Sequence, residues 1–216
     1  MLIHHREGGT GVPVDRLDRL EGVDQSAQRA GKGRVVSCLG GREALQSVEP
    51  VDRNPGPTLP VVDEHLDAAL GASTFPAGEL LREVAHQVGW AQPYPEHVGE
   101  PDMDALRASY AYAPIVGARD DGPAPLWASD DVFAGIVLQG PDVIYPSHVH
   151  KAAELYWVAS GTARWQRGDE WASHGPGALF FHDTGVRHAT VTGHEPTLLL
   201  FAWVSDPASV PVIIRH

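Results

Sequence analysis

The pattern of apolar and polar positions divides the chain into three parts. Residues 1–57 combine scattered charges with glycine-rich and proline-rich turns and lack a continuous apolar stripe, so they form a poorly defined segment. Residues 58–124 place apolar side chains at intervals of three and four, which is typical of helices that bury one face. In residues 125–216, short runs rich in Val, Ile, Phe and Trp alternate with turn sequences, which indicates a β-barrel. The expected fold is therefore mainly β, with helices preceding the barrel.

Three helices are expected in the middle part. The first covers the apolar repeat Val62–Leu70. The second begins near Pro76, because proline suits the first turn of a helix. The third runs from Asp102, a residue type that caps helix N-termini, through Tyr110. Strands are expected after Gly117.

Two of the strand segments have an alternation that assigns their inward faces. Successive side chains on a strand point to opposite faces, so Glu154 and Tyr156 share one face. In the last long strand, Leu199, Phe201 and Trp203 share a face in the same way. These faces are predicted to point into the barrel.

Composition and charge exclude several classes of protein. The 216 residues are 43% hydrophobic and 20% charged, as in an ordinary globular domain. A formal net charge of −12 would repel a phosphate backbone, so no nucleic-acid partner is expected. The N-terminus lacks the apolar core of a signal peptide, and the longest apolar run, Leu198–Val204, is too short to cross a bilayer. The single cysteine, Cys38, rules out an intramolecular disulfide, and a cytoplasmic protein without a membrane partner is predicted.

One stretch of the barrel region carries the main candidate for chemistry. His148, His150 and Glu154 have the spacing H-x-H-x-x-x-E, and His188 closes the later sequence D-T-G-V-R-H. Because strand geometry lets two imidazoles and a carboxylate converge from adjacent strands, a metal site is predicted. Neutral imidazoles with a carboxylate suit Fe(II), Mn(II), Ni(II), Co(II) or Zn(II). The absence of thiolates argues against a structural zinc site.

The other histidines have simpler explanations. His174, His182 and His194 lie in the β region and are candidates for contacts with the ligands. The remainder are interpreted as ordinary surface or core residues: His4, His5, His65, His86, His97 and His216.

Three aromatic residues stand close to the candidate ligands or share their region. Tyr145 precedes the first histidine ligand by three residues, and Tyr156 follows Glu154 by two. A cation favours the phenolate form of a tyrosine that faces it, and such a phenolate is a suitable general base. An inward Trp203 would contribute a π face to a cationic substrate group. Packing of the barrel core is the alternative interpretation of all three.

The two histidine motifs resemble those of the cupin superfamily. The first cupin motif, G-x(5)-H-x-H-x(3,4)-E-x(6)-G, is matched from Gly140 to Gly161, with two extra residues after the first glycine. The second, P-x-G-x-x-H, is matched from Asp183 to His188, with aspartate in place of proline. The resemblance implies a double-stranded β-helix (jelly-roll) barrel that holds a metal ion inside its mouth.

Within the cupins, the chain is similar to the dimethylsulfoniopropionate (DMSP) lyases. The resembling sequences include Y-P-x-H-x-H-x-x-x-E-x-Y, G-V-R-H-A and L-L-L-F-A-W, and they fall roughly within residues 100–206. The resemblance implies that DMSP, a small zwitterion, is cleaved to dimethyl sulfide and acrylate by β-elimination. It implies a metal held by His148, His150, Glu154 and His188, Tyr156 as base, Tyr145 as base or substrate-orienting group, and Trp203 at the sulfonium.

Other functions remain open from the sequence. A cupin Fe(II) dioxygenase would use the same ligands but would consume oxygen and need no phenolic base. A sugar-type isomerase or a non-catalytic binding module would make both tyrosines expendable. Since cupins often associate through barrel edges, the chain is a possible homodimer.

Overall fold

The computed structural model describes residues 34–36, 45–47, 49–50, 58–119 and 122–215. Most of the poorly defined N-terminal segment, including Cys38, therefore lies outside the described residues. The helices are α1 (Pro60–Gly71), α2 (Gly78–Ala85), the 3-10 helix η2 (Pro95–His97) and α3 (Pro101–Ala108). The strands are β1 (Arg34–Val36), β2 (Leu45–Ser47), β3 (Glu49–Pro50), β4 (Tyr110–Gly117), β5 (Trp127–Ala128), β6 (Phe133–Gln139), β7 (Ile144–Val149), β8 (Glu154–Ser160), β9 (Ala163–Arg167), β10 (Glu170–His174), β11 (Leu179–His182), β12 (His188–Thr192), β13 (Thr197–Trp203) and β14 (Val212–Ile213).

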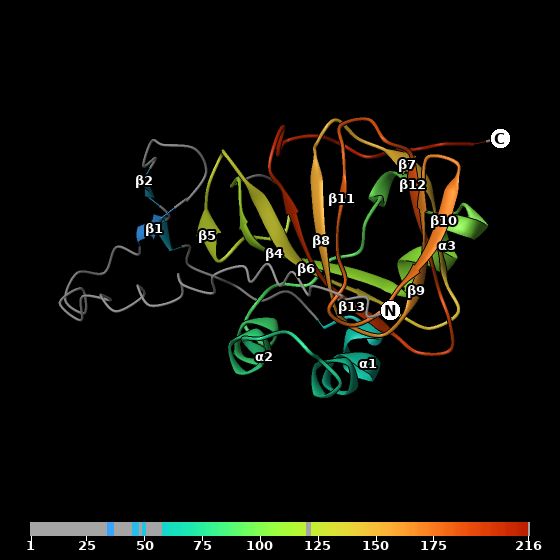
Figure 1. Ribbon diagram of the computed structural model, residues 1–216, viewed down its shortest axis with the longest axis horizontal. Helices are drawn as coiled ribbons and strands as arrows, with labels where there is room; N and C mark the ends of the chain where they lie inside the picture. The colour runs from blue at the N-terminus through green and yellow to red at the C-terminus, as the bar shows by residue number, and fades with distance from the viewer. Residues whose placement is uncertain (1–33, 37–44, 48, 51–57, 120–121, 216) are drawn as a thin grey trace, which may run out of the picture.

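Two sheets form the barrel, and the predicted cupin jelly-roll is confirmed (Figure 1). One sheet has five strands in the order β10-β9-β12-β7-β14, and the other has seven in the order β11-β8-β13-β6-β4-β5-β3. Strands distant in sequence are neighbours in both sheets, which is the mark of a double-stranded β-helix rather than of a simple meander. β1 and β2 pair only with each other among the described strands.

Helices α1 and α2 cover the outer face of the seven-stranded sheet (Figure 1). Pro60 opens α1, where a missing backbone N–H costs nothing, and Val62, Leu66 and Leu70 form its buried stripe. These side chains pack against Ile136, Leu138, Ala159 and Leu198 of the sheet. The helices therefore support the sheet from outside and leave its inner face to the site.

The helix boundaries differ from the sequence prediction at two places. The second helix begins at Gly78 rather than near Pro76. The third ends at Ala108, and Tyr110 begins β4, which pairs with β6. Pro114 concealed this strand, because proline cannot donate a ladder hydrogen bond, and the β4–β6 register shifts beside it.

The predicted inward faces are confirmed. Glu154 and Tyr156 of β8 lie in the inner core, opposite Trp203 and Phe201 of β13. At the end of β8, Gly161 has φ 75, and a Cβ there would lie 2.1 Å from the Pro196 carbonyl oxygen. The glycine that closes the first cupin motif is thus required by the tight β8–β9 turn.

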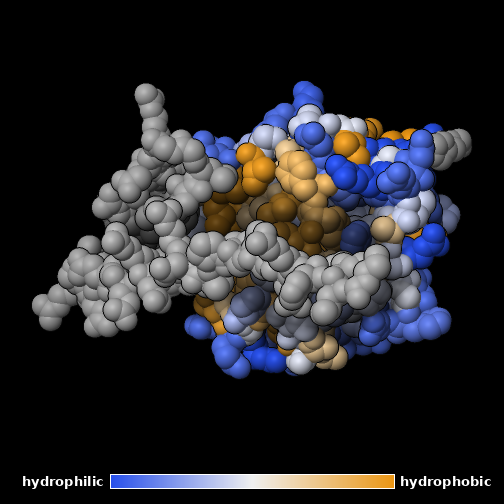
Figure 2. Space-filling model, in the orientation of Figure 1, coloured by the Kyte–Doolittle hydropathy of each residue, from blue (hydrophilic) through white to orange (hydrophobic). Residues whose placement is uncertain are grey.

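The described helices include none with the length and apolar character needed to span a bilayer. In the space-filling view, hydrophilic residues cover the lower and right-hand edges, and apolar residues gather nearer the centre of the face in view (Figure 2).

Candidate metal centre

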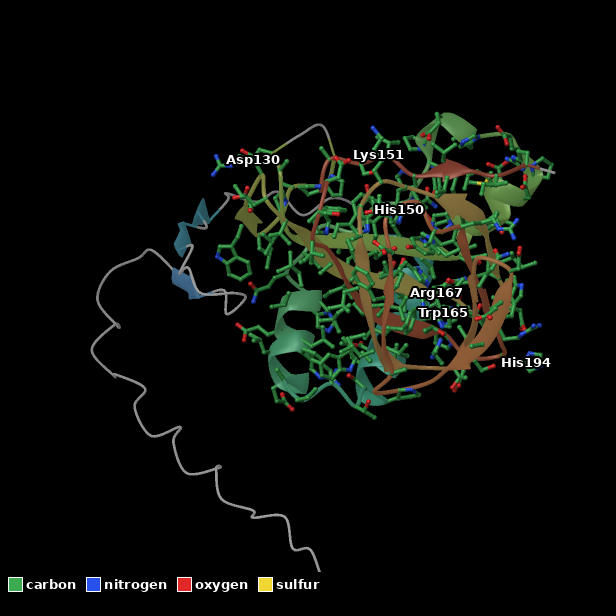
Figure 3. All side chains as sticks on the ribbon, turned by 45° about the horizontal axis from the view of Figure 1, so that its top comes forward. Asp130, His150, Lys151, Trp165, Arg167 and His194 are labelled. Carbon is green, nitrogen blue, oxygen red and sulfur yellow. The ribbon has the colours of Figure 1, made fainter. Side chains whose placement is uncertain are left out.

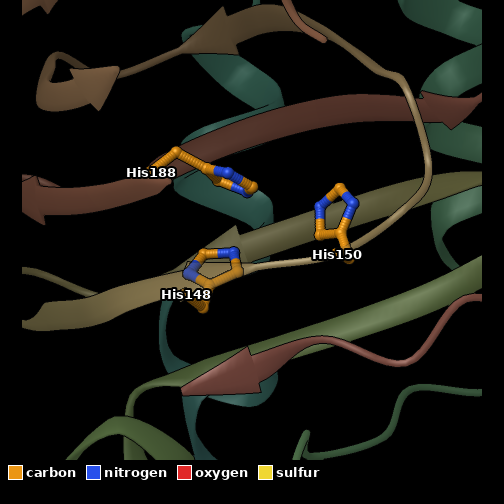
Figure 4. A group of neighbouring side chains, drawn as sticks. All are labelled: His148, His150 and His188. Carbon is orange, nitrogen blue, oxygen red and sulfur yellow. The ribbon is translucent and has the colours of Figure 1, made fainter. Parts of the chain in front are cut away.

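Three histidine rings face one another at one end of the barrel (Figure 4). His148 lies on β7, and His188 opens β12 directly opposite it in the antiparallel ladder. His150 follows the end of β7, so its ring approaches from the same side. The ring centroids of His148 and His188 are 4.0 Å apart, and those of His150 and His188 are 4.8 Å apart. One ligating nitrogen from each ring lies within 4.8 Å of the others.

Backbone carbonyls fix the orientation of all three rings. Nδ1 of His148 lies 2.9 Å from the Pro146 oxygen, Nδ1 of His150 lies 2.9 Å from the Ala152 oxygen, and Nδ1 of His188 lies 2.8 Å from the Val186 oxygen. A carbonyl oxygen only accepts, so each Nδ1 carries the proton. In the neutral rings, each Nε2 therefore keeps a lone pair that can bind a metal ion.

Glu154 completes the group from the facing sheet. Its Oε1 accepts a hydrogen bond of 2.8 Å from Trp203 Nε1, which turns Oε2 toward the histidines. Oε2 lies 3.1 Å from His150 Nε2 and 3.3 Å from His188 Nε2. Burial raises the pKa of Glu154, but the close contacts and charge of His150 and His188 outweigh it and hold that pKa below its usual range. The carboxylate is thus the anionic member of the group.

The donor chemistry fits a divalent metal ion. His188 Nε2 is buried and has no partner in hydrogen-bond geometry among the described residues, although the carboxylate is close to it. Lone pairs and a carboxylate that converge out of contact with water need positive charge between them. Three imidazole nitrogens and a carboxylate oxygen can supply the ligands of such an ion.

A further histidine adjoins this group. His182 ends β11 opposite Glu154, is 1% exposed, and its ring centroid lies 4.4 Å from that of His188. Its Nδ1 has no hydrogen-bond partner in the described part of the chain. Burial, with the nearby charge of His188, lowers the pKa of His182 to about 3, so this ring is neutral at neutral pH.

The other two histidines of the β region lie apart from the centre. His174 stacks on Phe180 at 4.4 Å. His194 has a 97% exposed side chain, pairs with Asp142, and lies well away from His150 (Figure 3). Of the three, only His182 reaches the ligands.

A cavity of about 390 Å³ opens beside the ligands and is lined mainly by apolar and aromatic side chains. His148, His150 and Glu154 lie in its wall. All five tyrosines of the chain line it as well: Tyr94, Tyr110, Tyr112, Tyr145 and Tyr156. Its size is that of a small-molecule site.

Tyr145 is held between a ligand and a second tyrosine. Its ring stacks on His148 with centroids 4.1 Å apart and an interplanar angle of 9°. Its hydroxyl lies 2.6 Å from the hydroxyl of Tyr94. Tyr94 itself has φ 55 and ψ 58, a left-handed conformation that is uncommon for a bulky side chain. Burial raises the pKa of Tyr145 well above its ordinary value.

Tyr156 faces the centre from β8, and Trp203 faces it from β13. The Tyr156 ring lies 5.1 Å from Trp165 and 5.7 Å from His182, centroid to centroid. Burial, aided by the charge of Glu154, raises the pKa of Tyr156 well above its ordinary value. Trp203 lines the cavity, and its ring lies 4.7 Å from His150. Trp203 therefore orients Glu154 in addition to forming cavity wall.

Comparison with known proteins decides the family. The family model for dimethylsulfoniopropionate lyase matches residues 39–199. The chain belongs to the DMSP lyase family. The match begins well before the residues 100–206 that carried the resemblance in the sequence, so the helical part and some of the preceding segment belong to the DMSP lyase pattern too.

Two curated relatives are similar to the chain. One, from Cereibacter sphaeroides, is provisionally named dimethylsulfoniopropionate lyase DddL and is 32% identical over 72% of this chain and 66% of its own length. The other, dimethylsulfoniopropionate lyase DddQ from Ruegeria pomeroyi, is 35% identical over 40% of this chain and 44% of its own length. The chain thus spans just under two thirds of the first relative and less than half of the second.

Two solved structures of DMSP lyases have the same fold. A structure from the work on RdDddP and RnDddQII aligns with a TM-score of 0.63 and 25% identity, over 78% of this chain and 84% of the other. The structure of DddQ from Ruegeria pomeroyi aligns with a TM-score of 0.61 and 26% identity, over 77% and 82%.

The sequence singled out two of the five cavity tyrosines and missed three. Tyr110 and Tyr112 belong to the strand that Pro114 concealed, and their alternation Y-A-Y-A was the available signal. Tyr94 lies in a proline-rich loop, 51 residues from its partner Tyr145, and no local pattern marks it.

Proposed function

We propose that the protein is a metal-dependent lyase that cleaves DMSP to dimethyl sulfide and acrylate. Family membership and the two relatives named as DMSP lyases support the substrate and the bond that breaks. The structural observation that carries the proposal is the convergence of three oriented imidazoles and Glu154 beside a tyrosine-lined cavity. Such a site pairs a cation with phenolic groups, which are the two components that a β-elimination next to a carboxylate requires.

The ligands in this proposal are His148, His150, Glu154 and His188. Fe(II), Mn(II), Zn(II), Ni(II) and Co(II) all accept this donor set. When bound, such an ion would hold the substrate carboxylate, stabilise negative charge at the adjacent carbon, and favour the phenolate form of a facing tyrosine.

Tyr156 is the proposed base. It shares the inward face of β8 with Glu154 and lines the same cavity as His148, His150 and Glu154. Burial keeps this phenol protonated in the protein alone, so nearby positive charge is needed to release its proton. The phenolate takes the proton from the carbon beside the carboxylate, and that electron pair forms the carbon–carbon double bond. The carbon–sulfur bond then breaks toward sulfur, releasing dimethyl sulfide and leaving acrylate.

Tyr145 and Trp203 hold the substrate in this proposal. Stacking on His148 and the bond to Tyr94 fix the position of Tyr145 in the wall of the cavity. The indole N–H of Trp203 is occupied by Glu154, so its ring supplies the interaction with a sulfonium. A cation beside an aromatic ring in a desolvated site gains about 2 kcal/mol.

The test is headspace gas chromatography of dimethyl sulfide from purified protein and DMSP, with Fe(II), Mn(II), Ni(II), Co(II) or Zn(II) added in turn. Metal-dependent release of dimethyl sulfide with equimolar acrylate, equally fast without oxygen, is the expected result. The metal-loaded Tyr156→Phe variant serves as the negative control, and His194→Ala as the matched surface control. No release by folded, metal-loaded protein would overturn the lyase assignment, and an absolute need for oxygen would point to a dioxygenase.

A further inference from the structure

His182 is a buried histidine beside the proposed ligands that the lyase mechanism does not use. It is 1% exposed, and it lies on β11 directly opposite Glu154 on β8. Its ring packs edgewise against Tyr156 at 5.7 Å and lies tilted against His188 at 4.4 Å, centroid to centroid. An imidazole enclosed in this way normally satisfies its nitrogens with hydrogen bonds.

The nitrogen chemistry of His182 differs from that of the other three rings. Those rings each give Nδ1 to a backbone carbonyl two residues away, whereas Nδ1 of His182 is buried without a hydrogen-bond partner in the described chain. A buried polar atom without a partner is costly, so a group other than the described residues is expected to fill this valence.

His182 lies where a metal ion could be that partner. A ligating atom of His182 lies within 4.8 Å of those of Glu154 and His188, forming a second group able to hold a cation. The first group, His148, His150 and His188, shares His188 with it. Nδ1 of His188 is used by the Val186 carbonyl, so this ring has only Nε2, with one lone pair, to offer. The two groups therefore describe one ion rather than two.

We propose that His182 is an additional ligand side chain of this single ion, on the side of the centre that faces away from the cavity. His148, His150 and Glu154 line the cavity, whereas His182 and His188 are not among its lining residues. His182 and His188 would hold the ion from the side away from the cavity, and a substrate carboxylate would approach it from the cavity. The inference rests on the proposed metal centre but not on the proposed lyase reaction.

The test compares Zn(II) affinity in the full chain, measured by competition with a chromophoric chelator. His182→Leu replaces the imidazole with an apolar side chain of similar bulk, and His182→Gln replaces it with a polar one. We expect the dissociation constant to rise about 10- to 100-fold in His182→Leu, with a smaller rise in His182→Gln. His194→Ala is the matched control and should leave the constant unchanged, because His194 is exposed and distant.

Two spectroscopic measurements complement the affinity, and the first needs no variant. In the wild-type protein with ¹⁵N-labelled histidine, Zn(II) should shift the nitrogen resonances of four imidazoles rather than three. The Co(II) absorption spectrum of His182→Leu should also change in band position or intensity, because coordination number changes.

The outcomes separate this inference from the proposed function. Wild-type protein that binds Zn(II) while only three imidazoles shift, with an unchanged constant in folded His182→Leu, would show that His182 does not bind the ion and would overturn the inference. Wild-type protein that binds no divalent ion would overturn it together with the metal centre. Four shifted imidazoles in a protein without lyase activity would support the inference and reject only the reaction.

Discussion

The histidine centre and the tyrosine-lined cavity lie side by side but are built in different ways. Each ligand ring is oriented by a carbonyl two residues away along the chain, so its geometry is local. The tyrosines come from a loop and three strands, and the Tyr94–Tyr145 bond joins residues 51 positions apart. The proposed metal-binding half is therefore encoded by short motifs, and the proposed substrate-binding half depends on tertiary packing.

The largest expected effect on metal binding and activity comes from a substitution in the histidine centre. His188→Ala removes the ring whose Nε2 has no other partner, so metal affinity should fall more than about 100-fold. Activity with DMSP should fall to background, while the far-ultraviolet circular dichroism stays unchanged. Metal content by mass spectrometry after dialysis checks this, with His194→Ala as the control. Normal metal content in His188→Ala would contradict the assignment of this ligand.

Tyr156→Phe tests the tyrosine-lined cavity and leaves the four proposed metal ligands unchanged. Removing the hydroxyl of the proposed base should lower kcat by about 10² to 10⁴, the range for loss of general-base catalysis. Metal content and melting temperature should stay near the wild-type values, since the ring and its contacts with Trp165 and Phe180 remain. Kinetics with each active metal check this. Retained kcat would move the base to another tyrosine, with Tyr145→Phe as the next variant.

The same contrast explains what the sequence could predict. The spacing of His148, His150 and Glu154, with the later G-x-x-H, was sufficient to predict that four side chains lie close together. Strand alternation and a tight turn place them there. Tyr156 and Trp203 followed from the same alternation. The sequence predicted His182 only as one of three candidates for contact with the proposed ligands, because the pairing of its strand with β8 cannot be deduced from the local pattern.

The part that could not be predicted depends on long-range packing. Tyr94 adopts a left-handed backbone conformation in a loop whose position over the barrel is set by tertiary contacts. Strand β4 was hidden because Pro114 and a register shift break the alternation that reveals strands. Period and spacing therefore identify ligands on strands, but they do not identify loop residues that reach the same cavity.

The pH dependence of stability should distinguish the histidine centre from the tyrosine-lined cavity in the metal-free protein. The pKa of His182 is lowered to about 3 by burial, against about 6.5 in an unfolded chain. Between these values the unfolded state binds a proton that the folded state does not, so stability falls as pH decreases below about 6.5. The slope approaches about 1.4 kcal/mol per pH unit for one such group.

Urea unfolding with a chelator present, between pH 6.5 and 5.0, measures this slope. His182→Leu should flatten it, although His148, whose pKa is also lowered by burial, keeps part of it. Between pH 7 and 9 the tyrosines should contribute no slope, because burial raises the pKa of Tyr145 and Tyr156 well above their ordinary values. A slope that His182→Leu leaves intact would show that other groups control acid stability.

The smallest expected effect concerns the bond between the two tyrosines at the rim of the cavity. Tyr94→Phe keeps the ring contacts with Tyr145 and His97 but removes the 2.6 Å hydroxyl pair. Loss of one buried hydrogen bond should cost about 1 kcal/mol of stability. If this bond orients Tyr145 toward the substrate, kcat/KM should fall about 10-fold, the kinetic equivalent of about 1.4 kcal/mol, while Zn(II) affinity stays constant.

Tyr110→Phe is the matched control, because its ring also packs against Tyr145. Equal losses in both variants would mean that the effect is not specific to the Tyr94–Tyr145 bond, whereas a loss confined to Tyr94→Phe would show that a bond between distant residues contributes to the chemistry.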